Sequence, residues 1–334
     1  MCQAAALLVG VCLAAGAGSR LRPLTTERPK VLCPVGGRPL LSFAIDRLVG
    51  VTDEVVVNVH HHRAMMLGWL HLAAGATSAA PTAGAAFWRG FDGSARDHPE
   101  RGELQSCGTV GPATAGELPR LPGDAAVASG RTVGEAQLVA SLEGPEALGT
   151  AGALAALADH LDGRSVLAIN ADSLIGVDLS EVVARWDGER PLVAHGGEGG
   201  FRPGVPVVAS ITPWSTIAHL AATPSGLYGH VWKDAHGAGA LQTVRLEGPV
   251  IDCGTPRRYL AANLALSGGA TLSEYSGDRT TEPARTAPAG VTRSVLWAGA
   301  EVEPGERLDG AVRTTGGRTM LVRPVPGGSA PPAG

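Results

Sequence analysis

The chain has 334 residues, of which 44% are hydrophobic and 17% charged, a composition typical of a globular protein and not of a disordered one. At about 150 residues per domain, this length predicts one large domain with an appendage, or two ordinary domains. The net charge of −4 argues against binding of nucleic acid or anionic lipid by bulk electrostatics, so we expect neither a nucleic-acid nor a membrane partner.

The five cysteines are odd in number, widely spaced and include no CxxC pair. This pattern favours reduced thiols in a cytoplasm over a disulfide framework or a structural zinc site. The apolar start, MCQAAALLVGVCLAAGAG, lacks a basic region and is too short to span a bilayer. We therefore expect a cytoplasmic protein without a signal peptide or a transmembrane helix.

Apolar runs alternate with helical periods along much of the chain. The predicted strands cover residues 5–15, 53–59 and 164–172, and the predicted helices cover residues 40–50, 149–161, 179–186 and 255–266. The first strand is apolar throughout, which suits a buried parallel strand better than an alternating edge strand. Strands that alternate with helices predict an α/β fold with a mainly parallel sheet.

Residues 73–134 interrupt this alternation within a main domain that we assign to residues 1–265. The segment is rich in Gly, Ala, Pro, Ser and Thr, and it contains no convincing element. Because so long a structureless segment is unusual inside a compact domain, we interpret it as a low-complexity, mobile insertion.

The carboxy-terminal part has its own pattern. A polar linker over residues 266–290 precedes a segment in which Leu296, Val302 and Leu308 recur every six residues, the hexapeptide period of a β-helix. Residues 291–323 provide about one coil, which we expect to pack on the main domain. A hexapeptide-repeat acyltransferase would need several coils. Residues 324–334 have no means of forming a core, and we expect them to be disordered.

The loop after the first strand carries glycines and cations together. Gly16 and Gly18 allow tight turns and close approach of a ligand, leaving backbone N–H groups free to face phosphate oxygens. Arg20, Arg22 and Lys30 add positive charge to the same loop. The pattern indicates a phosphate-binding loop.

Two common nucleotide-binding motifs are excluded for this loop. Leu21 occupies the third glycine position of a GxGxxG fingerprint, and no GxxxxGK[ST] phosphate loop exists in the chain. Pro23 and Pro29 prevent a helix from starting at once. We therefore expect a wrapping loop, in contrast to the strand-to-helix turn of a nicotinamide-binding domain.

Residues 13–41, LAAGAGSRLRPLTTERPKVLCPVGGRPLL, resemble the signature LAAGxGTRLxPLTxxxPKxLxPVxxxPLL of the sugar-phosphate nucleotidyltransferases, with Ser19 in place of Thr. Three later motifs occur in that family's order: EALGTAGAL over 146–154, NADSL over 170–174 and VIDCGTPRRYLAAN over 250–263. The resemblance implies a Rossmann-like sheet flanked by helices, of the nucleotide-diphospho-sugar transferase type, here with a short β-helix-like coil.

The resemblance also implies an activity. The family joins a nucleoside triphosphate to a sugar 1-phosphate, forming a nucleoside-diphosphate sugar and releasing pyrophosphate. Arg20 would brace the triphosphate and Lys30 would bind the α-phosphate, since charge that develops on a transferring phosphoryl group is stabilised by cations. The implied nucleotide-binding residues are Leu13, Ala14, Ala15, Gly16, Gly18, Ser19 and Arg20.

Two aspartates end predicted strands. Asp172 follows an apolar strand, where ligands of open α/β folds bind, and Asp252 lies in VIDCG at another strand end. Two carboxylates that converge there would suit Mg²⁺, the role that the resemblance assigns to both. The alternative for each is an ordinary helix or turn cap, the role that we predict for Asp178.

The segment LGTAGAL places Gly149 and Thr150 at a helix start, which the resemblance directs toward the sugar and nucleoside. An acidic residue just upstream would contact the sugar hydroxyls, and both Glu143 and Glu146 qualify. The alternative is an ordinary helix amino terminus, where the dipole favours acidic residues.

Other features depart from the family or fit it loosely. The FxEKP stretch that supplies a second lysine in many members is missing, and Lys233 is the only other lysine in the chain. His60, His61 and His62 are consecutive and therefore point in different directions, so we do not predict a zinc site.

We expect GDP-mannose as the first product to test, followed by UDP- or dTDP-sugars. The sequence is also compatible with a homo-oligomer. The rival hypothesis is a non-catalytic sugar-nucleotide sensor, motivated by the missing lysine and the insertion.

Overall fold

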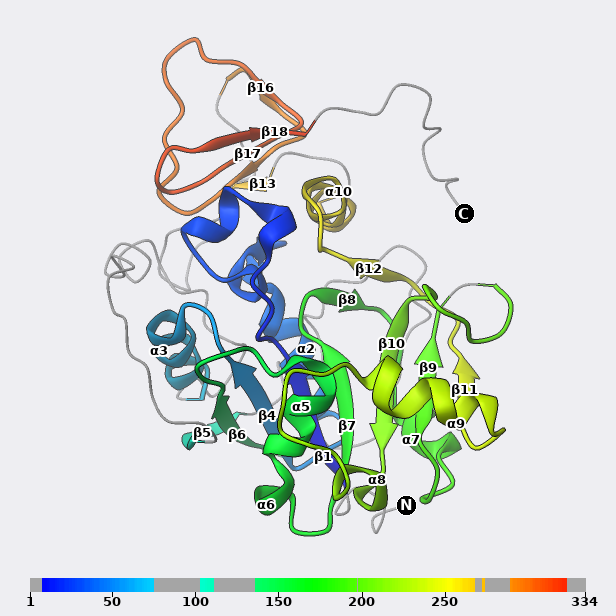
Figure 1. The fold of residues 1–334 in the computed structure, drawn as a ribbon. Helices are drawn as coiled ribbons and strands as arrows, with labels where there is room; N and C mark the ends of the chain where they lie inside the picture. Colours follow the sequence, from blue (N-terminus) through cyan, green and yellow to red (C-terminus); the bar gives the residue numbers. More distant parts are fainter. Residues whose placement is uncertain are drawn as a thin grey trace.

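The computed structural model describes residues 8–74, 103–110, 136–196, 198–267, 272–273 and 289–322. Its centre is an eight-stranded sheet (Figure 1). In spatial order the strands are β11 (Gln242–Arg245), β9 (Leu192–His195), β10 (Val207–Thr212), β7 (Ser165–Asn170), β1 (Leu8–Leu13), β4 (Glu54–Val59), β6 (Ala136–Leu142) and β5 (Glu103–Val110).

The middle of this sheet is parallel. Strand β1 pairs in parallel with both β4 and β7, and β4 pairs in parallel with β6, whereas β5 and β10 run antiparallel to their neighbours. The carboxyl ends of β1, β4 and β7 therefore lie at one edge of the sheet, where the loops that follow them meet. The predicted mainly parallel α/β sheet is confirmed.

Helices cover both faces of the sheet, because its central strands are apolar on both sides. The described helices are α2 (Leu40–Val49), α3 (Arg63–Ala74), α5 (Gly149–Ala156), α6 (Ala158–Leu161), α7 (Leu179–Arg185), α8 (Trp214–Ile217), α9 (Lys233–Gly237) and α10 (Pro256–Leu266). Val9 and Val11 pack with α5, α6 and α8 on one face, whereas Cys12 packs with α2, α3 and α7 on the other.

Shorter elements complete the main body. They are the 3-10 turns η1 (Ser19–Leu21), η2 (Leu24–Thr26) and η3 (Lys30–Leu32), the π-helical turn η4 (Tyr228–Trp232), the hairpin β2 (Pro34–Val35) with β3 (Arg38–Pro39), and the antiparallel pair β8 (Ser173–Ile175) with β12 (Val250–Asp252). The turns η1 to η3 show that the segment after β1 is a wrapping loop, as its prolines predict.

Most predicted elements lie where the sequence places them. Strands β1, β4 and β7 and helices α2, α7 and α10 are confirmed, and Asp178 caps α7 by accepting a hydrogen bond from the Ser180 N–H at 2.9 Å. The helix expected over 149–161 is interrupted at Leu157 and forms α5 and α6.

The expectation that residues 73–134 contain no element is wrong over residues 103–110. These residues form β5, which pairs antiparallel with β6 and thereby completes one edge of the sheet. The unpaired backbone groups of β6 supply the partner, so a segment of weak intrinsic pattern becomes a strand. Residues 75–102 and 111–135 lie outside the described residues.

The carboxy-terminal coil comprises β13 (Leu272–Ser273), β14 (Val291–Thr292), β15 (Val295–Leu296), β16 (Leu308–Asp309), β17 (Ala311–Arg313) and β18 (Thr319–Leu321). Parallel pairing joins β14 to β16 and β15 to β17. Leu296 and Leu308 are buried, and Val302 packs against them, as the six-residue period predicts. Figure 1 shows this coil in orange and red beside α10 and the blue segment that follows β1. The tail expected over 324–334 lies outside the described residues.

Two further observations bear on the predictions. Within the described ranges, no helix is long and apolar enough to cross a membrane. Cys12, Cys107 and Cys253 are free thiols, and these three residues and Cys33 are all buried. Burial raises the pKa of the Cys12 and Cys253 thiols far above the usual value, so neither is a reactive thiolate.

Candidate active site

A pocket lies where β1 ends and the wrapping loop begins. Its volume is about 230 Å³, and its lining residues are Leu13, Ala14, Gly16, Gly18, Ser19, Arg20, Lys30, Val31, Asp172 and Gly254. Small-molecule sites typically measure about 300–1,000 Å³. The described pocket is therefore smaller than a typical small-molecule site and would hold only part of a larger ligand.

The loop's shape depends on Gly18. This residue has φ +62°, and a Cβ added to it would lie 2.8 Å from Thr25 Cγ2 and 2.9 Å from Lys30 Cβ. Gly16 differs, since a Cβ there would meet nothing within 4 Å. Of the two glycines singled out in the sequence, only Gly18 is required by both its backbone conformation and its surroundings.

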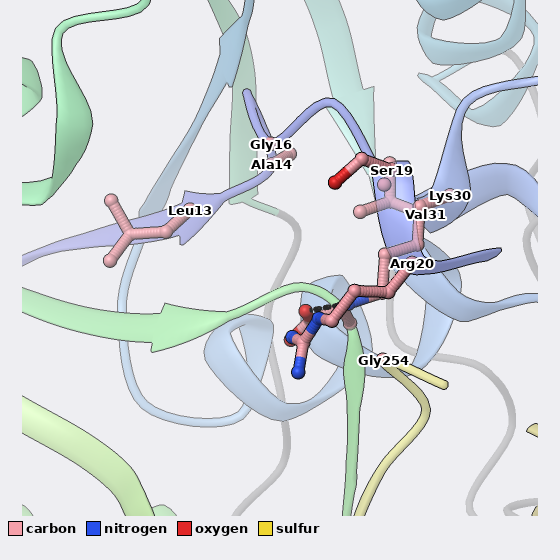
Figure 2. Close-up of a pocket in the computed structure, with 10 residues that line it drawn as sticks. Leu13, Ala14, Gly16, Ser19, Arg20, Lys30, Val31 and Gly254 are labelled. Atoms are coloured by element: carbon pink, nitrogen blue, oxygen red, sulfur yellow. Dashed lines mark hydrogen bonds and ion pairs between the residues drawn. The ribbon is translucent and has the colours of Figure 1, made fainter. Parts of the chain in front are cut away.

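Three charged side chains meet at Gly254, and a fourth, that of Asp172, pairs with one of them. A Cβ built on Gly254 would lie 2.6 Å from Asp252 Oδ1, 2.9 Å from Arg20 Nη2 and 3.1 Å from Lys30 Nζ. Lys30 Nζ in turn donates to Asp172 Oδ2. Figure 2 shows Arg20 and Lys30 extending from the loop toward the side of the pocket where Gly254 lies. The predicted convergence of Arg20, Lys30, Asp172 and Asp252 is therefore observed.

The ion pair between Lys30 and Asp172 explains how the lysine is buried. Lys30 is 6% exposed, and a buried ammonium is costly without a charged partner. Asp172 follows β7 and keeps 29% of its side-chain surface exposed. The lysine is therefore held inside the loop while its charged end reaches the pocket.

Asp252 lies at a strand end, as predicted, but its strand is not part of the main sheet. It ends β12, which pairs with β8 so that Asp252 lies opposite Ser173, the neighbour of Asp172. Its Oδ1 accepts from the Gly254 N–H at 2.7 Å and its Oδ2 from Arg258 Nη1 at 2.7 Å. The small antiparallel pair therefore brings the two carboxylates to the same end of the molecule.

A buried polar network supports the start of the loop. Asn58, at the end of β4, accepts from the N–H groups of Ala14 and Ala15 through Oδ1, and it donates from Nδ2 to Glu143 Oε1 at 2.7 Å. Glu143 Oε2 accepts from the Leu148 N–H at 2.8 Å. The two alanine N–H groups donate to Asn58 and are therefore not free to contact a ligand. Ala15 does not line the pocket.

Glu143 is 2% exposed, and both of its carboxylate oxygens accept hydrogen bonds from the protein. Burial raises the pKa of Glu143, and the hydrogen bonds from the Leu148 N–H and Asn58 offset only part of that effect. This geometry suits a residue that holds Asn58 in place better than one that contacts sugar hydroxyls.

The other predicted sugar-binding residues are not brought to the described pocket. Glu146 is exposed, and Thr150 Oγ1 accepts from the Leu227 N–H at 2.8 Å. A Cβ on Gly149 would lie 2.5 Å from the Ser225 carbonyl oxygen. The start of α5 is thus packed against residues 223–227, which sequence reasoning did not anticipate.

The histidines and the second lysine lie outside the pocket. His60 Nδ1 lies 3.2 Å from the Glu143 carbonyl oxygen, and His62 Nε2 lies 3.1 Å from that of Thr25. Among the residues that the structure describes, no group of three or more His, Cys, Asp or Glu side chains could hold a metal ion. Lys233 begins α9, is exposed and does not line the pocket.

Asn58 and Arg258 are the site residues that the sequence analysis missed. The signal for Asn58 is its place as the one polar residue in the apolar run VVVNV over residues 55–59. Arg258 gives no comparable signal, because it is one of two consecutive arginines at the start of a helix.

Comparisons with known proteins agree with this geometry. Residues 9–77 match the family model for nucleotidyl transferases. Over 54 residues the chain is 50% identical to an N-acetylmuramate α-1-phosphate uridylyltransferase of Caulobacter vibrioides, covering 16% of this chain and 22% of that protein. Over 49 residues it is 49% identical to the UTP–glucose-1-phosphate uridylyltransferase AglF of Haloferax volcanii, covering 15% and 20%. The matches thus span about a fifth of these relatives.

Solved structures extend the similarity of fold beyond that segment. A Bacillus anthracis protein assigned as a glucose-1-phosphate thymidylyltransferase aligns with 78% of this chain and 95% of its own, at a TM-score of 0.51 and 15% identity. A UDP-glucose pyrophosphorylase from Acinetobacter baumanii aligns with 77% and 92%, at a TM-score of 0.50 and 15% identity. The resemblance to the sugar-phosphate nucleotidyltransferases is therefore confirmed, in sequence over the amino-terminal segment and in fold over most of the chain.

Proposed function

We propose that this protein transfers a nucleotidyl group from a nucleoside triphosphate to a sugar 1-phosphate, giving a nucleoside-diphosphate sugar and pyrophosphate. The observation that carries the proposal is the meeting of Arg20, Lys30, Asp172 and Asp252 beside Gly254. A site for two anionic substrates needs cations that are fixed before the substrates arrive. The nucleotidyl transferase match over residues 9–77, which include Arg20 and Lys30, supports the same reaction.

In the proposed step, a phosphate oxygen of the sugar 1-phosphate attacks the α-phosphorus of the triphosphate. The new oxygen–phosphorus bond forms as the bond between the α-phosphorus and the bridging oxygen breaks, and pyrophosphate leaves with that electron pair. The attacking oxygen is already ionised, so no general base is required. Arg20 and Lys30 stabilise the negative charge that spreads over the transferring group and orient the triphosphate.

We propose Mg²⁺ as the cofactor. The donor set fits, because Mg²⁺ prefers one or two carboxylates together with phosphate oxygens and water. Asp172 and Asp252 would hold it, and their side chains keep 29% and 36% of their surface exposed. When bound, the ion would neutralise negative charge on the phosphates.

For the base and the sugar we propose several candidates to test. GDP-mannose remains the product predicted from the sequence, and the names of the two uridylyltransferase relatives place UTP beside GTP as a donor to test. Most residues that line the described pocket belong to the loop for which we propose phosphate contacts, and such contacts do not distinguish one base from another. A cytoplasmic location likewise remains a prediction from the cysteine pattern.

The experiment is a pyrophosphate-release screen of five nucleoside triphosphates against a panel of sugar 1-phosphates, with and without Mg²⁺. We expect Mg²⁺-dependent release with at least one pair, and loss on the order of 10²-fold or more in Arg20→Ala. The matched control is Arg293→Ala, because Arg293 is an exposed arginine of the carboxy-terminal coil. Sugar-nucleotide binding without release from any pair would favour the sensor hypothesis instead.

A further inference from the structure

The residues just before Lys30 are engaged by the far end of the chain. Glu27 Oε1 accepts from Thr314 Oγ1 at 2.6 Å, and Glu27 Oε2 accepts from the Gly316 N–H at 3.1 Å. Arg318 Nε lies 3.3 Å from Glu27 Oε1. The turn between β17 and β18 therefore surrounds one carboxylate of the wrapping loop with hydrogen-bond donors.

The fit of this turn is close. A Cβ added to Gly316 would lie 2.8 Å from Glu27 Oε1 and 3.1 Å from Glu27 Cδ. No larger residue could occupy this position without displacing the carboxylate. The turn and the loop are thus shaped to each other by backbone as well as by side chains.

Arg28 forms a second contact with the coil. It is 2% exposed, its guanidinium carbon lies 4.0 Å from the ring centroid of Trp297, and its Nη2 lies 3.5 Å from Thr315 Oγ1. A buried guanidinium is costly unless its charge is compensated, and an aromatic face within about 6 Å provides part of that compensation. The coil therefore supplies the surroundings that Arg28 needs.

Trp297 is connected through Tyr259 to the end of the wrapping loop. Its Nε1 donates to Tyr259 Oη at 3.1 Å, and the Tyr259 hydroxyl donates to the Pro34 carbonyl oxygen at 2.5 Å. Trp297 and Tyr259 are 1% and 0% exposed. They share one apolar cluster with residues on both sides of Glu27 and Arg28: Leu21, Leu24, Cys33 and Val35.

Lys30 cannot move independently of these contacts. Only Pro29, whose φ is −59°, separates Lys30 from Arg28. The loop thus has the coil on one side and the Asp172 carboxylate and Gly254 on the other. A shift of about 1 Å in a substrate-positioning group can lower a rate about 10²-fold.

We propose that the carboxy-terminal coil is a positioning element of the site. Through Glu27, Arg28 and Trp297 it holds the wrapping loop so that Lys30 and Arg20 remain beside Asp172 and Gly254. These three are positioning residues, because none of them lines the pocket. The kinetic consequence rests on the proposed function, whereas the structural consequence does not.

The test uses full-length Glu27→Gln, Arg28→Met and Trp297→Leu. Trp297→Phe is the conservative variant, since it keeps an aromatic face for Arg28. The control is Arg293→Met, which breaks the exposed Arg293–Asp309 pair of the same coil, whose side chains are 66% and 53% exposed. Each folded protein is studied by amide hydrogen exchange and, where the unmodified protein releases pyrophosphate, by steady-state kinetics.

We expect exchange in peptides covering residues 19–33 to rise about tenfold in Glu27→Gln and Arg28→Met. Three N–H groups make exchange in this segment sensitive to its structure, because each donates a hydrogen bond within it. They belong to Leu21, Leu32 and Cys33, which donate to the carbonyls of Gly18, Pro29 and Lys30, respectively. Peptides covering β1 and β7 should not change. The rate constant kcat should fall about 10-fold to 100-fold, with Trp297→Phe near the unmodified protein and Trp297→Leu among the impaired variants.

Two outcomes would overturn the proposal. One is unchanged exchange over residues 19–33 in the conservative Glu27→Gln protein, which is expected to fold. The other is an equal rise over β1 and β7, which would mean that the coil only adds global stability. If no substrate pair yields pyrophosphate, the proposed function fails, but the exchange result still decides whether the coil positions the loop.

Discussion

The two sides of the site are built differently. On the phosphate side, Arg20, Lys30, Asp172 and Asp252 come from separate segments and place their charged ends together beside Gly254. On the side where the sugar was expected, Gly149 and Thr150 are packed against residues 223–227. Charged groups thus lie at the pocket, whereas Gly149, Thr150 and the buried Glu143 make packing and hydrogen-bond contacts within the protein.

A motif residue can therefore have either of two roles. A glycine or acid next to a binding segment can hold that segment in place without contacting the ligand itself. Glu143 illustrates this, since its hydrogen bonds connect it to the pocket through Asn58 and the backbone of Ala14. Substitutions on the phosphate side should therefore lower the rate, and those on the support side should lower stability.

The largest expected effect is on the rate. Lys30→Met removes the ammonium that pairs with Asp172 at the pocket and keeps most of the buried volume of the side chain. We expect pyrophosphate release to fall on the order of 10²-fold to 10³-fold, measured by kcat and KM for both substrates. Lys233→Met, at the exposed lysine, is the control. A loss below about threefold in Lys30→Met would remove Lys30 from the reaction.

The next effect is on stability. A Cβ on Gly152 would lie 2.2 Å from the Thr223 carbonyl oxygen, so Gly152→Ala forces backbone apart. We expect a loss of about 2–4 kcal/mol in the free energy of unfolding, measured by urea denaturation. Gly16→Ala is the matched control, because a Cβ there meets nothing within 4 Å. Equal stability of the two variants would contradict the tight packing of α5 on residues 223–227.

A smaller effect concerns Glu143 and pH. Burial raises the pKa of Glu143, so the folded protein holds this proton more tightly than the unfolded chain, whose value is about 4.3. The stability from this group is therefore present below the unfolded pKa and is lost as pH rises through the folded pKa. Glu143→Gln cannot titrate.

The stability of the unmodified protein relative to Glu143→Gln should accordingly decline as pH rises above the unfolded value of about 4.3. Free energies of unfolding of both proteins, measured as a function of pH, test the direction of this change. A relative stability that rises with pH would show that the hydrogen bonds from Asn58 and Leu148 outweigh burial.

The smallest effect is at Arg258. Its guanidinium bonds Asp252 at 2.7 Å and is 60% exposed, so the pair contributes about 1 kcal/mol or less. Arg258→Met should free that carboxylate and raise Mg²⁺ affinity about twofold to fivefold, measured by calorimetric titration without substrates. The exposed neighbour Arg257 supplies the control, Arg257→Met. Unchanged or weaker Mg²⁺ binding in Arg258→Met would place the ion away from Asp252.

The local sequence pattern was sufficient to predict the strands and helices around the pocket. The apolar runs that became β1, β4 and β7 are buried on both faces, so composition alone marks them. By contrast, β11 is largely exposed and short, and β5 depends on the free edge of β6. Such strands are set by their neighbours and have little signal of their own.

The site, like the fold, could be predicted in part. Motifs in the sequence identified its charged residues, but the partners of these residues depend on tertiary contacts. Nothing in the sequence indicates that Glu27 meets the turn of Thr314 and Gly316, because almost the whole chain separates them. The role of Asp252 was expected, whereas its origin in a separate antiparallel pair was not.

The most direct test of the central claim is a double-mutant cycle between Lys30→Met and Asp172→Asn, with pyrophosphate release as the readout. If the two side chains act together on one triphosphate, their effects should be strongly non-additive, with a coupling of about 1 kcal/mol or more. Losses that multiply independently would contradict the account, because they would mean that the lysine and the aspartate do not share a site.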